Sequence, residues 1–195
     1  MVSTDKNYSQ SFKEKFLFLR HYLSNPRKTG SVYPSSTALG KAMLSFLENK
    51  QESTIIELGP GTGSITKTLI RSGINLDNFH ACEISEAFAE HLRKRFPGIH
   101  VREGDASELT RVFEEFVGKV DCIFSSLPLK SLPSATVRKI IDQEYEILKT
   151  KGIVIQFSYD LRQRKNALTD KFKYIGSKIV IANLPPARVD AYIKE

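Results

Sequence analysis

Short apolar runs alternate with stretches in which apolar residues recur three or four positions apart, and this alternation continues along most of the chain. The first pattern predicts buried strands and the second predicts amphipathic helices. The expected strands are residues 54–56, 78–83, 99–106, 120–125, 153–159, 174–182 and 187–193. The expected helices are residues 37–49, 64–70, 86–96, 108–116 and 133–149, with Gly152 as the C-cap of the last. Strands that alternate with helices predict an α/β domain built on a mainly parallel sheet.

The N-terminal region has a pattern of its own. Residues 1–10 are polar and are expected to form a flexible N-terminus, whereas residues 11–195 are expected to form a single domain without a linker. A helix is predicted over residues 11–24, and its apolar surface wraps further round than one core contact requires. This pattern fits a helix in a membrane interface and equally a helix packed on the sheet. The residues expected to contact a membrane are Phe12, Phe16, Phe18, Lys13, Lys15 and Arg20.

The distribution of charge adds to this picture. The chain of 195 residues has a net charge of +7. Residues 1–41 hold seven Lys/Arg against two Asp/Glu, a net of +5, and the remaining residues hold 22 against 20. A basic N-terminal arm suits RNA, an anionic phospholipid surface, or solubility alone.

Other compositional features exclude some classes of protein. No apolar run approaches the length of roughly 18 residues that a membrane-spanning helix needs. The start of the sequence lacks the pattern of a secretory signal, so a cytoplasmic location is expected. Cys82 and Cys122 fall within two expected strands, where they are expected to be small core residues, and they lack metal-ligand spacing, so a zinc site is not expected.

The strongest chemical signal is the loop after the first expected strand, Glu57-Leu58-Gly59-Pro60-Gly61-Thr62-Gly63. A strand, a glycine-rich turn and a helix in this order form the nucleotide-binding crossover of a doubly wound sheet. Gly59, Gly61 and Gly63 allow the backbone to turn tightly while a ligand lies against it. The loop by itself fits a dinucleotide and S-adenosylmethionine equally well.

Two further acidic residues follow the next two strands, Glu83 after the second and Asp105 after the third. This triple of Glu57, Glu83 and Asp105 resembles the class I S-adenosylmethionine-dependent methyltransferases. The resemblance implies that Glu83 holds the ribose and that Asp105 accepts from the adenine amino group. It implies a Rossmann-like fold with strand order 3-2-1-4-5-7-6, helices on both faces, an antiparallel last strand and two N-terminal helices. The expected cofactor-binding residues are Glu57, Gly59, Gly61, Gly63, Glu83, Ile84, Asp105, Ala106 and Ser125.

The loop after the fourth strand, Ser126-Leu127-Pro128-Leu129, bears on the methyl acceptor. The ribosomal RNA adenine dimethyltransferases share the Glu-Leu-Gly-Pro-Gly-Thr-Gly loop and carry an Asn-Leu-Pro-Tyr type of sequence here. Their Asn amide and a backbone carbonyl accept from the adenine amino group, and the aromatic ring stacks on the base. This chain lacks both the amide and the ring, which favours an aliphatic amine.

Four blocks resemble the bacterial phospholipid N-methyltransferases: residues 18–20 with 29–36, 125–129, 156–159 and 183–189. The resemblance covers residues 12–193 and implies methylation of phosphatidylethanolamine and its methylated intermediates. We therefore expect a monomer bound peripherally to the inner face of the membrane, with anionic lipids and the lipid substrate as partners and no nucleic acid or metal. An ornithine-lipid N-methyltransferase, an RNA methyltransferase similar to the adenine dimethyltransferases, and a binding scaffold without activity remain alternatives.

The residues expected to act on the substrate follow from the same blocks. Tyr159, Ser126 and Leu127 are the expected catalytic residues, and Tyr33, Ser35 and Arg188 are expected to bind the substrate. The rings of Tyr159 and Tyr33 suit a methylated ammonium through cation–π contact, although a tyrosine at a solvated rim explains them too. The candidates for a lipid phosphate are Arg162, Arg164, Lys165 and Arg188.

Overall fold

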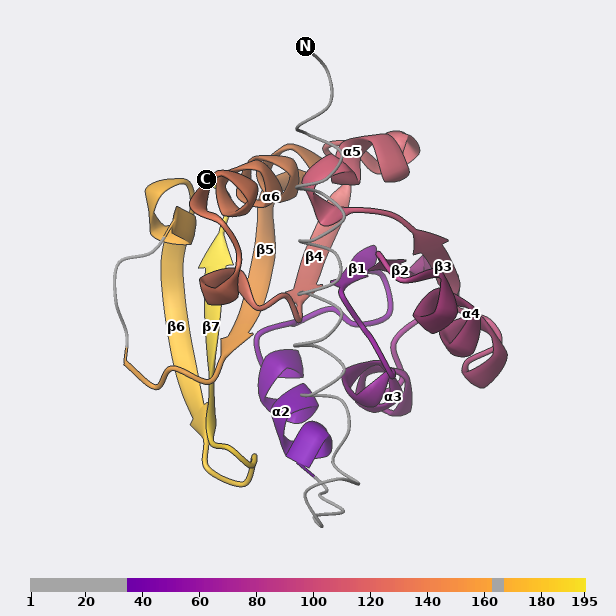
Figure 1. Cartoon of the computed structure of the whole chain (residues 1–195), viewed down its shortest axis with the longest axis horizontal. Helices are drawn as coiled ribbons and strands as arrows, with labels where there is room; N and C mark the ends of the chain where they lie inside the picture. Colours follow the sequence, from indigo (N-terminus) through magenta and orange to yellow (C-terminus); the bar gives the residue numbers. More distant parts are fainter. Residues whose placement is uncertain (1–34, 163–166) are drawn as a thin grey trace. The chain divides into compact units, whose positions relative to one another are not determined.

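The computed structural model describes residues 35–162 and 167–195. Seven strands form one sheet in the order β3-β2-β1-β4-β5-β7-β6 (Figure 1). Neighbouring strands run parallel except β7, which is antiparallel to both β5 and β6. This confirms the predicted Rossmann-like order with an inserted antiparallel strand.

The elements have the following bounds. The strands are β1 Ile55–Leu58, β2 Phe79–Glu83, β3 His100–Glu103, β4 Val120–Ser125, β5 Leu148–Ser158, β6 Lys173–Val180 and β7 Ala187–Ile193. The α-helices are α2 Ser35–Leu44, α3 Ser64–Arg71, α4 Glu86–Arg95, α5 Leu109–Val112 and α6 Ser134–Ile147. Short 3-10 turns are Leu76–Asn78, Ala106–Glu108, Glu114–Phe116, Leu129–Ser131 and Ala167–Asp170. The predicted helix over residues 11–24 lies outside the described residues.

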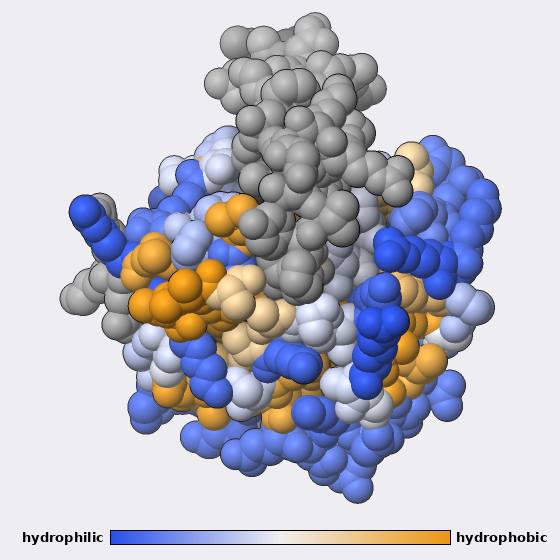
Figure 2. Space-filling view, turned by 90° about the horizontal axis from the view of Figure 1, so that it is seen from below, coloured by the Kyte–Doolittle hydropathy of each residue, from blue (hydrophilic) through white to orange (hydrophobic). Residues whose placement is uncertain are grey.

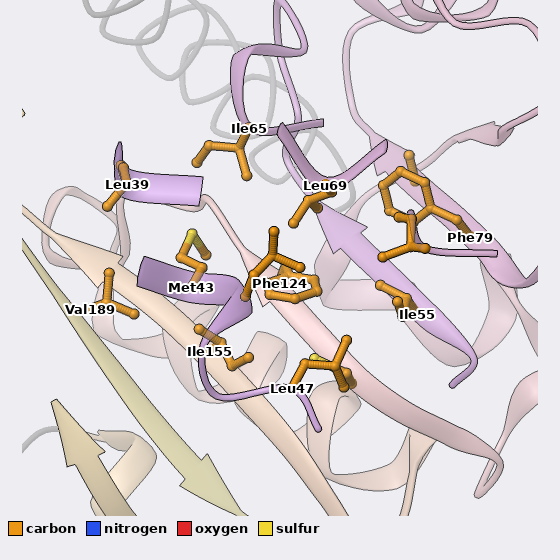
Figure 3. Close-up of a cluster of buried hydrophobic side chains, with 14 of the residues drawn as sticks. Leu39, Met43, Leu47, Ile55, Ile65, Leu69, Phe79, Phe124, Ile155 and Val189 are labelled. Carbon is orange, nitrogen blue, oxygen red and sulfur yellow. The ribbon is translucent and has the colours of Figure 1, made fainter. Parts of the chain in front are cut away.

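One face of the sheet carries the main hydrophobic core (Figure 3). Successive side chains of a strand point to opposite faces, so every second strand residue reaches this core. Helices α2, α3 and α4 cover it with buried side chains such as Met43, Leu69 and Leu92. The strand residues that meet them include Ile55, Phe79, Phe124, Ile155 and Val189. Each such side chain contributes about 1.5 to 3 kcal/mol through removal from water.

The other face is closed by α6 and the irregular segment before β4. Ile140, Ile141 and Ile147 of α6 are buried, as is Ile123 of β4. Cys82 on β2 and Cys122 on β4 are both free thiols, separated by β1 as predicted.

Three predicted elements differ from the structure. The predicted helix 108–116 is broken at Phe113, whose backbone has φ −130° and ψ 53°. Phe113 is fully buried and its ring lies 6.0 Å from that of His80, with Phe116 at 4.4 Å from the same histidine. Burial of Phe113 and the contact of both aromatic rings with His80 of β2 therefore override the helical periodicity of this segment.

The predicted C-cap at Gly152 is wrong. Helix α6 ends at Ile147, and β5 begins at once with Leu148. The register of β5 against β4 jumps from Val120↔Leu148 to Cys122↔Ile153, so Gly152 lies in an irregular stretch of strand. A Cβ atom at Gly152 would lie 2.9 Å from the carbonyl oxygens of Val120 and Lys149, so glycine is needed for close backbone approach.

Helix α2 is shorter than predicted. It ends at Leu44, where the Ser45 hydroxyl donates to the Ala42 carbonyl at 2.7 Å. The N–H groups of Phe46 and Leu47 then donate to carbonyls three residues back, which tightens the last turn. Leu47 still reaches the core, as its periodicity predicts.

Candidate active site

The glycine loop lies between β1 and α3, at the edge of the sheet where the parallel strands end. Gly59, Gly61 and Gly63 have φ values of 70°, 60° and 76°. Residues with a side chain rarely adopt this left-handed backbone, so the pattern of alternate glycines has a conformational cause. The Gly59 N–H donates to the Cys82 carbonyl at 2.9 Å, which fixes the start of the loop to the end of β2.

Gly63 has a second reason to be glycine. A Cβ atom there would lie 2.4 Å from a ring carbon of Phe96 and 2.9 Å from a methyl carbon of Leu92. The third glycine thus lets the start of α3 pack closely on α4, in addition to shaping the loop. The sequence alone suggested a tight turn and the approach of a ligand, but not this packing.

Glu83 is a fully buried carboxylate at the end of β2. Its Oε2 accepts from the Gly61 N–H at 3.0 Å, and its Oε1 accepts from the Ser85 N–H at 3.0 Å. These two bonds orient the carboxylate between the glycine loop and the turn that contains Ile84. A carboxylate is acceptor-only and offers about four acceptor positions, which suits a pair of neighbouring hydroxyl groups.

Glu57 and Asp105 also have defined structural partners. The Thr66 hydroxyl of α3 donates to Oε2 of Glu57 at 2.7 Å, and Glu57 is fully buried on β1. Asp105 precedes the turn Ala106–Glu108, and its Oδ1 accepts from the Ser107 N–H at 2.8 Å. The Gly104 N–H donates to the Glu83 carbonyl at 3.0 Å, so the ends of β2 and β3 are joined. The three acids therefore stand at the ends of adjacent strands, as predicted.

The loop after β4 is held against β1 and β5. The Ser126 N–H donates to the Leu58 carbonyl at 2.9 Å. The Leu127 carbonyl accepts from the Gln156 side-chain amide at 3.0 Å and from the Leu129 N–H at 2.9 Å. A carbonyl oxygen has two lone pairs, so both acceptor positions of Leu127 are used within the protein.

Polar side chains continue across the sheet on the α6 face. Ser125, Gln156 and Asp190 are direct cross-strand partners on β4, β5 and β7. All three are buried, and Ser125 Oγ, Gln156 Oε1 and Asp190 Oδ1 have no hydrogen-bond partner among the described residues. The same holds for Ser126 Oγ. Together with Nη1 of Arg188, five such polar atoms without partners among the described residues lie at or beside the site, and sequence reasoning missed the contribution of Gln156 and Asp190. Their signal is a polar residue within an otherwise apolar strand.

Arg188 is not an open surface cation. It is 4% exposed, and its Nε and Nη2 donate to Oδ2 of Asp190 at 2.9 and 2.7 Å. The two residues are at positions i and i+2 of β7 and share a face, which brings them together. The pair neutralises the charge of the guanidinium that the sequence suggested for a lipid phosphate.

Tyr159 follows the last residue of β5 and is 39% exposed. Its ring packs edge-on against Phe157 with 5.6 Å between centroids. Burial raises the pKa of its hydroxyl, although an interaction with the Asn183 side chain acts in the opposite direction. The phenol therefore stays protonated near neutral pH and is unsuited to remove a proton.

Most of the remaining predicted substrate-binding and membrane-binding residues lie in parts of the chain that the structure does not describe. Ser35 is the first residue of α2. Tyr33, Arg164, Lys165 and the expected membrane residues Phe12, Phe16, Phe18, Lys13, Lys15 and Arg20 lie outside the described residues. Within the described part of the chain, no helix is long and apolar enough to cross a membrane.

Comparison with known proteins adds the family. A family model described as "Methyltransferase domain" matches residues 55–152, which span β1 to the start of β5 and half of the chain. The chain belongs to this methyltransferase family. S-adenosylmethionine is its cofactor, and the loop of Gly59, Gly61 and Gly63 with Glu57, Glu83 and Asp105 fits it. The cofactor supplies a methyl group activated on a sulfonium.

The individual proteins that this chain resembles share only a low sequence identity with it. The methyltransferase is 29% identical over 151 residues to an ornithine lipid N-methyltransferase of Singulisphaera acidiphila, covering 75% of this chain and 78% of that protein. It is 22% identical over 181 residues to ribosomal RNA small subunit methyltransferase A of Borrelia garinii subsp. bavariensis, covering 93% of this chain and 62% of the relative. A solved structure of 1,6-didemethyltoxoflavin-N1-methyltransferase from Burkholderia thailandensis, with bound S-adenosylhomocysteine, superposes with a TM-score of 0.71 at 12% identity. That match covers 100% of this chain and 92% of the other and shows the fold alone.

Proposed function

We propose that this methyltransferase methylates the aliphatic amine of an aminolipid head group at a membrane surface, with phosphatidylethanolamine and its methylated intermediates as the main substrates. The observation that carries the proposal is the state of the loop after β4. Its Leu127 carbonyl already accepts from Gln156 and from Leu129. The Leu127 carbonyl is therefore not free to accept from a planar amino group on a base, and the loop has no amide or ring side chain for such a group.

An aliphatic amine makes different demands. Its reference pKa is near that of Lys, about 10.4, so the neutral nucleophile costs about 4 to 5 kcal/mol at pH 7. A buried position beside a cation lowers this cost, because both desolvation and like charge disfavour the ammonium. The amine nitrogen would then bond to the methyl carbon as the methyl–sulfur bond breaks, with S-adenosylhomocysteine as the leaving group, and the resulting ammonium would lose a proton before another round.

The residues of this chain have separate roles in the proposal. The hydroxyl of Ser126, at the end of β4, accepts from the amine, while Ser125 lies at the cofactor side. The exposed edge of the Tyr159 ring contacts the methylated ammonium through a cation–π interaction, worth about 0.5 to 2 kcal/mol. Since the pKa of Tyr159 is raised, the proton passes to water at the rim and not to this phenol.

An ornithine lipid is the second candidate, and one observation favours it. The buried ion pair of Arg188 with Asp190 removes the best-placed cation for a lipid phosphate. An ornithine lipid has an aliphatic amine but no phosphate, so it does not need that cation. The relative named for this activity supports the same alternative.

One experiment separates these candidates from RNA methylation. The purified full-length protein is incubated with radiolabelled S-adenosylmethionine and one of four acceptors: phosphatidylethanolamine vesicles, ornithine-lipid vesicles, vesicles without a primary amine, or ribosomal RNA. We expect label in phosphatidylethanolamine and none in the amine-free vesicles. A Glu83→Ala protein controls for contaminating activity. Label in RNA alone would contradict the proposal, and label in ornithine lipid alone would establish the second candidate.

A further inference from the structure

The hairpin between β6 and β7 lies at the same edge of the sheet as the active-site loops. Val180 pairs with Ala187 at its base, and Arg188 pairs with Ser158, the last residue of β5. Because β5 runs parallel to β1 and β4, its end marks the edge that also carries the glycine loop. Figure 1 shows the hairpin at the bottom of the molecule, where β5 also ends.

Large apolar side chains are exposed at this edge. Ile181 is 80% exposed, Ile179 is 57% exposed and Leu184 is 56% exposed. Tyr159 and Leu161, which follow β5, are exposed to a lesser degree, and the interaction of Tyr159 with Asn183 joins the two loops. We call Tyr159, Leu161, Ile179, Ile181 and Leu184 the apolar rim. Figure 2 views the molecule from this side and shows apolar side chains gathered at its left, in the region of the hairpin.

Hydrogen bonds within the hairpin fix the conformation of its turn. Asn183 is buried, its side-chain amide donates to the Pro185 carbonyl at 2.7 Å, and its N–H donates to the Val180 carbonyl at 3.3 Å. Ile181 and Leu184 lie on either side of Asn183 in this bonded turn, and both are exposed.

Two basic side chains flank the rim, and the one acidic side chain within it is paired. Residues 177–187 contain one lysine and no acidic residue. That lysine, Lys178, is exposed and lies over the Phe46 ring at 5.2 Å. Arg162 is also exposed beside the rim, whereas the carboxylate of Asp160 is bound to Lys130. An apolar tip flanked by these cations, with the Asp160 carboxylate compensated by Lys130, complements an anionic bilayer.

We propose that the apolar rim inserts into the boundary between head groups and acyl chains of an anionic membrane and so sets the active-site edge against the lipid. This inference rests on the proposed aminolipid substrate, which resides in that bilayer. A bilayer fits better than a folded partner, because the exposed side chains stand at the end of β6, in the narrow turn that follows it and in the loop after β5, beside the reaction edge. A second copy of this chain or another protein remains an outcome of the test.

The test uses the full-length protein and vesicles of phosphatidylcholine with phosphatidylglycerol. Ile181→Ser and Leu184→Ser are combined in one variant, because neither residue has a role in the proposed active site. Val117→Ser is the matched control: Val117 is 43% exposed, but it precedes β4 and so lies at the opposite edge. We expect co-sedimentation of the double variant to need about tenfold more lipid, whereas the control stays within about twofold of the parent protein.

Two further measurements interpret the result. Thermal melting and calorimetry with S-adenosylhomocysteine should be unchanged in both variants, since the substitutions lie on the surface. Turnover of a short-chain aminolipid below its critical micelle concentration should also be unchanged, while turnover of vesicle substrate falls in the double variant alone.

The outcomes are distinct. The inference would be overturned by any of three results. The double variant could bind vesicles as well as the parent protein, the Val117→Ser control could lose as much binding as the double variant, or the parent protein could fail to bind vesicles. Light scattering that shows a dimer in the parent and a monomer in the double variant would also overturn it. Rim-dependent vesicle binding without methylation of any aminolipid would leave the inference standing and remove the proposed substrate.

Discussion

At the scale of single residues, the Leu127 carbonyl is the group whose surroundings bear most directly on the acceptor. Gln156 donates to it from the neighbouring strand, 29 residues away in sequence. We therefore expect Gln156→Met, which keeps volume but removes the donor, to lower kcat by about tenfold through a loosened β4 loop. A hydrogen bond of this kind contributes about 0.5 to 1.5 kcal/mol. Affinity for S-adenosylhomocysteine, measured by calorimetry, should change by less than about twofold. A kcat equal to that of the parent would show that this bond does not position the loop.

Glu83 provides a test of the cofactor site. Replacing it with Ala removes the acceptor proposed for the ribose and also the bonds from Gly61 and Ser85. A charge-assisted hydrogen bond is worth about 1.5 to 3 kcal/mol, so calorimetry should show at least about a tenfold loss of affinity for S-adenosylhomocysteine. The neighbouring Glu86→Ala, in the first turn of α4, serves as the control and should bind normally. Normal binding by a folded Glu83→Ala protein would mean that the ribose lies elsewhere.

Two glycines with similar left-handed backbones allow the cost of backbone strain to be separated from the cost of overpacking. Gly63 and Gly118 have φ values of 76° and 71°. An alanine at Gly118 would meet no atom within 4 Å, so it should cost only the left-handed backbone, about 1 to 2 kcal/mol. An alanine at Gly63 would also press on Phe96 and Leu92, which adds about 1 to 3 kcal/mol of overpacking. Urea unfolding of both variants measures the difference, and equal destabilisation would disprove the packing role of Gly63.

At the scale of elements, α6 carries an unusual buried acid. Glu144 is fully buried, and both of its carboxylate oxygens have no partner among the described residues. Burial raises its pKa to about 8. The folded state therefore keeps a proton that the unfolded chain releases near its ordinary pKa of 4.5. More protons are bound in the folded state over this window, so the stability contributed by Glu144 is lost as pH rises towards 8.

His80 on β2 acts in the opposite direction. Burial, followed by the charges of His100 and Arg102, lowers its pKa from 6.5 to about 4, so its contribution is lost as pH falls from 6.5 to about 4. Between about pH 4.5 and 6.5 the effects of His80 and Glu144 on the free energy of unfolding have opposite signs. Above pH 6.5, of these two groups, only Glu144 still changes the stability with pH.

We therefore expect the free energy of unfolding to decline between pH 6.5 and 8, with a limiting slope of about 1.4 kcal/mol per pH unit for one proton. In Glu144→Gln this decline should be absent, as measured by urea unfolding at several pH values. A decline of the same slope in the variant would show that another group is responsible.

At the scale of the whole molecule, we predict from the sequence that the N-terminal arm, residues 1–41 with a net charge of +5, binds an anionic membrane. Deleting residues 1–24 removes four Lys/Arg and the apolar residues Phe12, Phe16 and Phe18. Each basic side chain contributes about 1 kcal/mol at an anionic surface and each buried ring about 1.5 to 3 kcal/mol. Vesicle binding should therefore fall by at least about a hundredfold, while affinity for S-adenosylhomocysteine is retained. If the helix instead packs on the domain, deletion will weaken nucleotide affinity or lower the melting temperature.

The sequence determined the sheet and the cofactor loop. Alternate glycines, acids at strand ends and the period of each apolar run are local patterns, and they act within a few residues of backbone. The order β3-β2-β1-β4-β5-β7-β6 follows from these patterns together with the family resemblance, and the structure confirms it.

Only the tertiary structure decided which hydrogen bonds and ion pairs each polar group at the site makes. Gln156 occupies the Leu127 carbonyl, Asp190 neutralises Arg188, and Phe113 breaks a helix to reach His80. The hairpin likewise leaves Ile181 exposed while Asn183, two residues on, is buried and bonded within the turn. Each of these outcomes depends on the position of atoms in three dimensions: hydrogen bonding and burial act over a few ångströms of space, whatever the separation along the chain.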